Sequence, residues 1–263
     1  SNKIEMNILI INQPPFNRGD ESAHKGLIRT LLKRFPDAKI KVMHEAWLSE
    51  SYRQYAVKDK RVEYFSEVEG CIKFPRFRNH DVYTNHTWLW KWHPTYRRME
   101  SIYKWADVVV CAPGGICMGG FQDWNHLYHL RLAQLFKRPL AYYGRSFGPF
   151  PTETERNRQF KKISLDMLHY FGYLSIRDHK TELLADELNI PYISTIDSAF
   201  LDSPKVEIPY ELKSVVGDKP YMVFVPNYLL WHYAYKGRIS HETVINFYCK
   251  VMDEIWAANP ELN

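Results

Sequence analysis

A chain of 263 residues, 45% hydrophobic and 25% charged, has enough apolar side chains for the core of one large or two modest soluble domains. Its 35 lysines and arginines exceed its 30 aspartates and glutamates, which gives a formal net charge of +5. The basic residues are scattered along the chain, so this charge mildly favours small anionic ligands and argues against a nucleic-acid partner.

Apolar runs alternate with helical patterns over the first 200 residues. Strands are predicted at 6–11, 39–43, 62–65, 107–111, 140–143, 172–176 and 192–195, and helices at 22–35, 125–136, 153–170 and 180–188. This alternation is typical of a mostly parallel sheet with right-handed crossovers. The predicted fold class of residues 1–200 is therefore α/β, a Rossmann-like doubly wound parallel sheet in one N-terminal domain.

The composition changes after residue 200. Residues 201–219 are rich in Pro, Lys, Glu, Ser and Gly and show little periodicity, as a linker does. A strand at 221–225 and a helix at 240–258 then look like the first β-α unit of a second Rossmann-like domain over 220–263. One unit cannot bury a sheet alone, so we expect either an incomplete second domain or a strand and helix that dock onto the first domain.

The cysteines and the hydropathy pattern exclude several classes of protein. The four cysteines lack C-x-x-C and paired metal-site spacings: Cys71, Cys111, Cys117 and Cys249. We expect reduced thiols, no metal and a cytoplasmic location. No apolar stretch approaches the roughly 18 residues needed to cross a bilayer, and no charged-then-apolar leader opens the chain, so the sequence gives no support for secretion or membrane insertion.

The loop between the first strand and the first helix is the most informative local feature. It contains Asn17, Gly19 and Asp20. Loops of this type lie at the carboxyl ends of parallel strands, where α/β proteins bind ligands. The loop has neither the dinucleotide-binding glycine pattern nor that of a P-loop. A structural alternative is that Asp20 caps the helix and Gly19 only supplies a turn.

Four further strand ends also carry glycine or polar residues. The relevant residues are Gly114 and Gly115 after the strand at 107–111, Arg145, Ser146 and Gly148 after 140–143, Arg177 and Asp178 after 172–176, and Asp197 after 192–195. Glycines let a backbone approach a ligand closely, although each pair could equally form a turn. Asp178 is placed to cap the next helix.

Together these loops resemble the successive motifs of the polysaccharide pyruvyltransferase family, in order and in spacing, over about residues 6–226. The motifs are Asn17-Arg18-Gly19-Asp20, Asp107 leading into Gly114-Gly115, Gly144-Arg145-Ser146-Phe147-Gly148-Pro149, Ser175-Ile176-Arg177-Asp178 and Asp197-Ser198-Ala199-Phe200. The resemblance implies a GT-B-like architecture of two facing Rossmann-like domains with the active site between them. It implies transfer of the enolpyruvyl group of phosphoenolpyruvate to a sugar diol as a ketal, with phosphate released.

The resemblance also suggests roles for individual residues. Phosphoenolpyruvate carries a carboxylate and a phosphate, and Arg177 is the leading candidate to bind them; an ion pair that pins the loop is the alternative. Asp20 is a candidate base and Asn17 a hydroxyl-binding amide. The other expected substrate-binding residues are Gly19, Gly114, Gly115, Arg145, Ser146, Gly148 and Asp197.

The expected partners are phosphoenolpyruvate and a glycan or lipid-linked sugar acceptor, with peripheral membrane association through the acceptor and no cofactor. Members of the family are thought to use a histidine and an arginine of the second domain. His232 and His241 lie in that half of the chain, but neither is a convincing counterpart. The chain also departs from the family pattern at Cys111-Ala112-Pro113 and at the bulky Phe147.

Aromatic and basic residues alternate in the stretch 74–105. An acceptor-binding flap and a nucleic-acid contact are both open interpretations, but Trp88, Trp90 and Trp92 also fit a half-buried strand or an insertion packed on the domain. His126 and His129 share a helix face, yet without a third ligand they do not indicate a metal site.

Two other functions compete with pyruvyl transfer. A glycosyltransferase with a nucleotide-sugar donor could use the same architecture, and a non-catalytic glycan-binding module could be built on the same fold.

Overall fold

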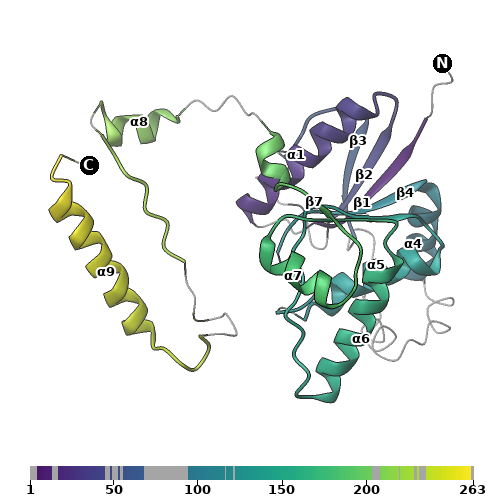
Figure 1. Cartoon of the computed structure of the whole chain (residues 1–263). Helices are drawn as coiled ribbons and strands as arrows, with labels where there is room; N and C mark the ends of the chain where they lie inside the picture. Colours follow the sequence, from purple (N-terminus) through teal and green to yellow (C-terminus); the bar gives the residue numbers. More distant parts are fainter. Residues whose placement is uncertain are drawn as a thin grey trace. The chain divides into compact units, whose positions relative to one another are not determined.

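A computed structural model describes most of the chain: residues 5–13, 17–44, 48, 53, 56–67, 94–115, 117–120, 122–202, 208–218, 220–227, 230 and 235–261. The backbone divides into two compact units, Ser1–Ser203 and Pro204–Asn263 (Figure 1).

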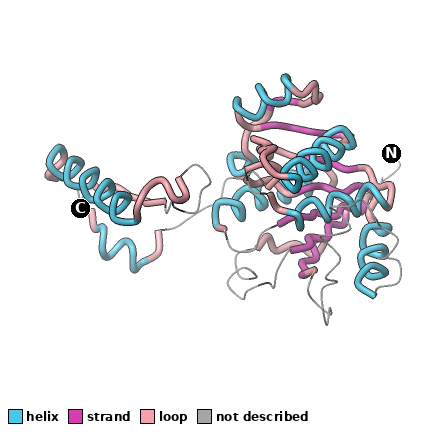
Figure 2. The backbone as a smooth tube through the Cα atoms, turned by 90° about the horizontal axis from the view of Figure 1, so that it is seen from below, coloured by secondary structure: helices cyan, strands magenta, loops and turns pink. Residues whose placement is uncertain are grey.

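The first unit is built on one sheet of seven strands in the order β3-β2-β1-β4-β5-β6-β7, and neighbouring strands run parallel. Figure 2 shows the strands in magenta among the cyan helices. The strands are β1 (Asn7–Gln13), β2 (Lys39–His44), β3 (Val62–Ser66), β4 (Val108–Cys111), β5 (Leu140–Tyr142), β6 (Tyr173–Ile176) and β7 (Ile193–Ser194). Each predicted strand of this unit is present within two residues of its expected ends. The prediction of a parallel α/β sheet is therefore confirmed.

Helices cover both faces of the sheet. They are α1 (Arg18–Arg34), α4 (Pro94–Trp105), α5 (Trp124–Leu135), α6 (Glu155–Tyr170) and α7 (His179–Glu187), followed by the short 3-10 helix η2 (Ser198–Leu201). Alternate residues of β1 enter different cores: Ile8 and Ile10 pack with Leu27 of α1, whereas Leu9 and Ile11 pack with Leu127 of α5. Because both faces are covered, the strand is apolar throughout rather than alternating.

The strand order reverses between β1 and β4. From β1 the chain adds β2 and β3 on one side, and the later strands extend the sheet on the other side. At such a switch point the loops at the carboxyl ends of the two strands diverge and leave a crevice where α/β proteins bind ligands. The loops that follow β1 and β4 are those that carry Asp20 and Gly114.

Two helices differ from the sequence-based expectation. Helix α1 begins at Arg18, four residues before the predicted start at Ser22, because Asn17 supplies its cap. Helix α4 occupies the end of the stretch 74–105 and was not predicted; Met99 and Tyr103, one turn apart, are buried in the core. The predictions for Trp88, Trp90 and Trp92 lie outside the described residues, as do Cys71 and His232.

The second unit contains α8 (Tyr210–Val216), which lies inside the predicted linker, and α9 (His241–Ala258), which matches the predicted helix. Ser240 caps α9 by accepting a hydrogen bond from the Thr243 backbone N–H at 3.1 Å. The predicted strand at 221–225 is wrong: residues 220–227 form no strand. A strand needs a neighbour for its backbone groups, and no described segment of this unit pairs with it. No helix in the described part of the chain is both long and apolar enough to cross a membrane.

Candidate active site

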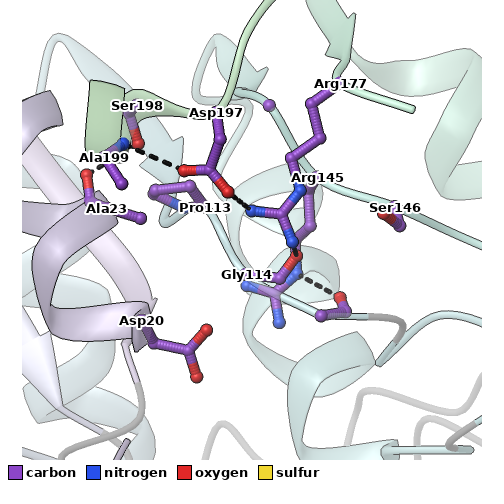
Figure 3. A network of polar contacts seen from close by, with 12 residues as sticks. Asp20, Ala23, Pro113, Gly114, Arg145, Ser146, Arg177, Asp197, Ser198 and Ala199 are labelled. Atoms are coloured by element: carbon purple, nitrogen blue, oxygen red, sulfur yellow. Dashed lines mark hydrogen bonds and ion pairs between the residues drawn. The ribbon is translucent and has the colours of Figure 1, made fainter. Parts of the chain in front are cut away.

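The carboxyl edge of the sheet brings together side chains from five loops, which follow β1, β4, β5, β6 and β7. Figure 3 shows Asp20, Gly114, Arg145, Arg177 and Asp197 in this region. Because all seven strands run the same way, their carboxyl ends share one edge and the loops become neighbours. Sequence analysis singled out all five residues, and we call this region the loop cluster.

Asn17, not Asp20, caps helix α1. The Asn17 Oδ1 atom accepts hydrogen bonds from the backbone N–H groups of Gly19 at 2.8 Å and Asp20 at 3.3 Å. The alternative in which Asp20 is only a cap is therefore wrong. Because the Asn17 oxygen forms the cap, the amide nitrogen of Asn17 is the group that could contact a ligand. The Asp20 carboxylate does not serve as the cap.

Asp20 lies in the first turn of α1 and is partly buried. Burial raises the pKa of its carboxyl above the ordinary value; the positive charges of Arg145 and Arg177 oppose the rise, and the charge of Asp197 adds to it. A carboxylate in this environment holds a proton more readily than one in water. This property suits a group that accepts a proton from a hydroxyl.

Arg177 follows β6 and makes two contacts that fix its direction. Its Nη1 forms an ion pair with Asp197 Oδ2, and its Nη2 donates to the carbonyl oxygen of Gly114 at 3.0 Å. The ion pair given as an alternative to donor binding is thus present. The Arg177 and Asp197 side chains nevertheless remain 22% and 28% exposed, and a guanidinium has more N–H donors than these contacts use.

Arg145 follows β5 and is only 1% exposed. Its guanidinium donates to the carbonyl oxygens of Ala112 at 2.7 Å and Gly115 at 3.1 Å, and to Cys117 Sγ at 2.9 Å. A Cβ on Gly114 would come within 3.3 Å of this guanidinium. Arg145 thus lies beneath the Gly114 loop, where it holds the loop in shape and places a positive charge near Asp20.

Gly115 is the exposed part of the same loop. A Cβ added there would meet no atom within 4 Å, so open space surrounds it. Gly114 and Gly115 therefore differ: the first is buried against Arg145, and the second presents backbone to solvent. Gly19, on the α1 side of the cluster, is also exposed, and a Cβ there would approach the capping oxygen of Asn17 to 3.1 Å.

Ser146 and Gly148 join the loop cluster to the rest of the fold. The Ser146 hydroxyl donates to Asp178 Oδ2 at 2.6 Å, while Asp178 Oδ1 accepts from the Thr181 backbone N–H at 2.9 Å. The prediction that Asp178 caps α7 is confirmed. Gly148 has a φ of +74°, and its backbone N–H donates to Met118 O at 2.7 Å. Both residues have contacts that stabilise the loops.

Sequence analysis missed His24. It lies one turn after Asp20 on α1 and is 2% exposed, and its Nε2 is 2.9 Å from the carbonyl oxygen of Pro113. Burial lowers its pKa to about 3, so the ring is neutral at pH 7 and Nε2–H donates to Pro113. The spacing of four residues from Asp20 was the available signal, because such residues share a helix face.

The chain is similar to a known protein family. The family model described as polysaccharide pyruvyl transferase matches residues 17–256. The chain belongs to the polysaccharide pyruvyl transferase family. No curated protein sequence matches it. A solved structure of a glycosyl transferase family 9 protein from Veillonella parvula DSM 2008 is similar at 11% identity with a TM-score of 0.29, covering 70% of this chain and 49% of its own. The chain thus spans about half the length of that protein.

In this member of the polysaccharide pyruvyl transferase family, both histidines of α5, His126 and His129, are buried. His129 Nε2 is hydrogen-bonded to a carboxylate oxygen of the buried Glu67, and Tyr103 donates to the His129 carbonyl oxygen at 2.9 Å. Burial lowers the pKa of His126 well below its ordinary value. Within the described residues, no group of three or more metal-binding side chains is present. The family that the chain matches is a family of transferases.

Proposed function

We propose that this protein transfers the enolpyruvyl group of phosphoenolpyruvate to a glycan or its lipid-linked precursor as a pyruvate ketal. Its membership of the pyruvyl transferase family supports the reaction class. The observation that carries the donor assignment is the partly exposed Arg177 guanidinium, fixed by Asp197 and the Gly114 carbonyl at the edge of the sheet. Guanidinium groups match the geometry of carboxylates and phosphates, and phosphoenolpyruvate has one of each.

The reaction needs the transfer of a proton to one carbon of phosphoenolpyruvate and the addition of two hydroxyl groups to the carbon next to it. The methylene carbon of phosphoenolpyruvate takes a proton and becomes a methyl group, and a sugar hydroxyl adds to the neighbouring carbon. Phosphate leaves with its bonding electrons, and a second hydroxyl of the sugar adds to close the ketal. Of the two hydroxyl protons lost in these additions, one balances the proton taken up by the methylene carbon and the other goes to the leaving phosphate, so phosphoenolpyruvate and diol give ketal and phosphate.

Asp20 is the proposed base for an attacking hydroxyl. It lies within electrostatic range of Arg177, and its raised pKa suits proton transfer from an alcohol. We assign hydroxyl binding to the Asn17 amide nitrogen and ligand contact to the exposed backbone at Gly19 and Gly115. Arg145, Ser146, Gly148 and Asp197, with Gly114, would then shape and hold the substrate-binding surface.

This assignment has consequences for where the protein works. Phosphoenolpyruvate is a cytoplasmic metabolite, so we place the reaction in the cytoplasm. A lipid-linked acceptor would bring the protein to the membrane surface without a spanning helix. The proposal requires no metal and no cofactor, because both substrates carry the groups that react.

The test is an assay of the full-length protein with phosphoenolpyruvate and a panel of bacterial surface glycans, read by mass spectrometry for the ketal and by phosphate release. We expect Arg177→Ala to lower kcat/KM for phosphoenolpyruvate by roughly 10- to 100-fold, because a charge-assisted contact to the anion is lost. The control is Arg158→Ala on α6, which removes an exposed arginine paired with Glu155 and should leave the rate unchanged.

Two outcomes would contradict the proposal. One is the absence of both ketal and phosphate with every acceptor, combined with sugar transfer from a nucleotide sugar or simple glycan binding. The other is an Arg177→Ala variant as active as the wild type, which would remove Arg177 from the donor site.

A further inference from the structure

Helix α1 and the 3-10 helix η2 approach each other unusually closely at Gly26. A Cβ on Gly26 would lie 1.8 Å from the carbonyl oxygen of Ser198 and 2.8 Å from its carbonyl carbon. These are backbone atoms, so no side-chain rotation could relieve the clash. The helix surface at Gly26 is therefore shaped to receive the backbone of residue 198. We call this contact the α1–η2 seam.

A buried hydrogen bond fixes the seam. Ser198 is 0% exposed, and its hydroxyl donates to the carbonyl oxygen of Ala23 on α1 at 2.6 Å. A second contact lies at the end of η2, where Asp202 forms an ion pair with Arg29. The two segments are far apart in sequence, yet a close backbone approach, a buried hydrogen bond and an ion pair hold them in one register.

The seam sets the position of Asp197, which immediately precedes Ser198. Asp197 Oδ1 accepts a hydrogen bond from the Ala199 backbone N–H at 2.9 Å, which ties the carboxylate to the first turn of η2. Its Oδ2 is then the atom that pairs with Arg177. A shift of η2 along α1 would therefore move the carboxylate that orients the Arg177 guanidinium.

Together with the contacts of Arg177 and of the Gly114 loop, the seam forms a closed ring of interactions that begins and ends on α1. Arg177 donates to the Gly114 carbonyl, and the neighbouring carbonyl of Pro113 accepts from His24 on α1. Asp20 lies one turn before His24 on the same helix. Figure 3 shows Asp20 on one side of this ring and Arg177 on the other. Gly26 and Ser198, which form the close contact of the seam, are both buried.

We propose that Ser198 and Gly26 are positioning residues for the pyruvyl transfer proposed above: the α1–η2 seam fixes the placement of Asp20 relative to Arg177. The inference rests on that proposed function and extends it to two residues that touch no substrate. Ser198 acts through Asp197, and Gly26 permits the backbone approach that Ser198 needs.

A double-mutant cycle separates positioning from simple stabilisation. The variants are Ser198→Ala, Asp197→Asn and their combination, with kcat and KM for phosphoenolpyruvate measured well below each thermal midpoint. We expect Ser198→Ala to lower kcat/KM roughly tenfold, since small misplacements of binding groups have large effects on rate. In the Asp197→Asn background the same change should cost less than about twofold, because the route from Ser198 to Arg177 is already broken.

Two further variants support the cycle. Thr30→Ala is the matched control: it also removes a hydroxyl that donates to a backbone carbonyl of α1, that of Gly26 at 2.8 Å, but it leaves Ser198 in place. It should not change kcat/KM. Ser198→Thr keeps the hydroxyl and should recover most of the lost activity. If Ser198→Ala does not fold at the assay temperature, Ser198→Cys takes its place in the cycle, because the thiol keeps a donor at this position but forms a weaker hydrogen bond.

The outcomes distinguish the inference from the function on which it rests. A wild-type protein that forms no ketal from phosphoenolpyruvate overturns the proposed function. An active wild type with an unchanged Ser198→Ala rate overturns the inference alone. So does an equal fractional loss in both backgrounds, because purely structural damage is additive with Asp197→Asn.

Discussion

At the scale of single residues, the loop cluster shows how burial decides what a polar side chain does. Arg145 and Arg177 carry the same charge and come from neighbouring strand ends. Arg145 is enclosed and bonds to three groups of the Gly114 loop, whereas Arg177 makes two contacts and stays partly exposed. The charge of both reaches Asp20. Only Arg177 is in a position to meet an anion from solvent.

His24 is a second case in which burial sets a residue's role. The unfolded chain binds a proton at His24 near pH 6.5, whereas the folded chain does so only near pH 3. Between these values the unfolded state holds more protons, so the contribution of His24 makes the free energy of unfolding fall as the pH is lowered below 6.5. The ring must stay neutral to fit its buried site against Pro113.

We predict that His24→Gln flattens this pH dependence. Glutamine can still donate to the Pro113 carbonyl but does not titrate. The loss of unfolding free energy between pH 7 and pH 5 should be smaller in the variant by about 2 kcal/mol. Denaturant unfolding at both pH values measures it. His44 and His126 also have lowered pKa values, so both proteins keep some slope, and equal slopes would show that His24 does not contribute.

At the scale of elements, the loops that follow β4 and β5 cross each other at two glycines. Gly119 has a φ of +148°, and a Cβ there would lie 2.4 Å from the backbone N and Cα of Gly148. Gly148 also has a positive φ. The structure uses Gly119 for a close backbone contact that joins the two loops.

Gly119→Ala should therefore destabilise the protein by about 2 kcal/mol or more, because the new methyl group meets backbone atoms that can move only with their loops. The matched control is Gly172→Ala, where a Cβ would have only one neighbour, the Leu140 carbonyl oxygen at 3.9 Å. Denaturant unfolding compares the two. A Gly119→Ala variant no less stable than Gly172→Ala would show that the crossing relaxes freely.

At the scale of the whole molecule, the two units differ in how much core they contain. The buried apolar residues come from the sheet and its helices in the first unit, and Val244 is the one such residue of the described second unit. Large apolar side chains of the second unit are instead exposed, among them Val225, Phe247 and Trp256. Burial of apolar surface is the main favourable term in folding, so stability should reside in the first unit.

We predict that residues 1–203 fold alone. Their sheet is covered on both faces, and η2 with Asp202 remains attached to α1. The fragment should unfold cooperatively, with a thermal midpoint close to that of the full chain. Circular dichroism and calorimetry measure this. Residues 204–263 alone should show no cooperative transition, and an aggregated or molten 1–203 fragment would contradict the prediction.

Much of the first unit could be predicted from sequence because its signals are local. A buried strand is a short apolar run, and α5, α6 and α7 follow hydroxyl or acidic residues that cap them. Because the strands are parallel, their carboxyl ends lie at one edge of the sheet, and the loop cluster was expected there. The prediction of a strand at 221–225 was wrong because strand formation is not local. The residues themselves favour a strand, but a strand also needs a partner, which local sequence does not specify.

Periodicity and chain order act over a few residues at a time, so the parallel sheet, its carboxyl edge and the residues of the loop cluster could be predicted from the sequence. The partner of each side chain instead follows from packing between distant segments. Arg177 pairs with Asp197, Ser198 bonds to Ala23, and Arg29 pairs with Asp202. These choices depend on distances between segments up to 175 positions apart, which packing sets and local sequence does not encode.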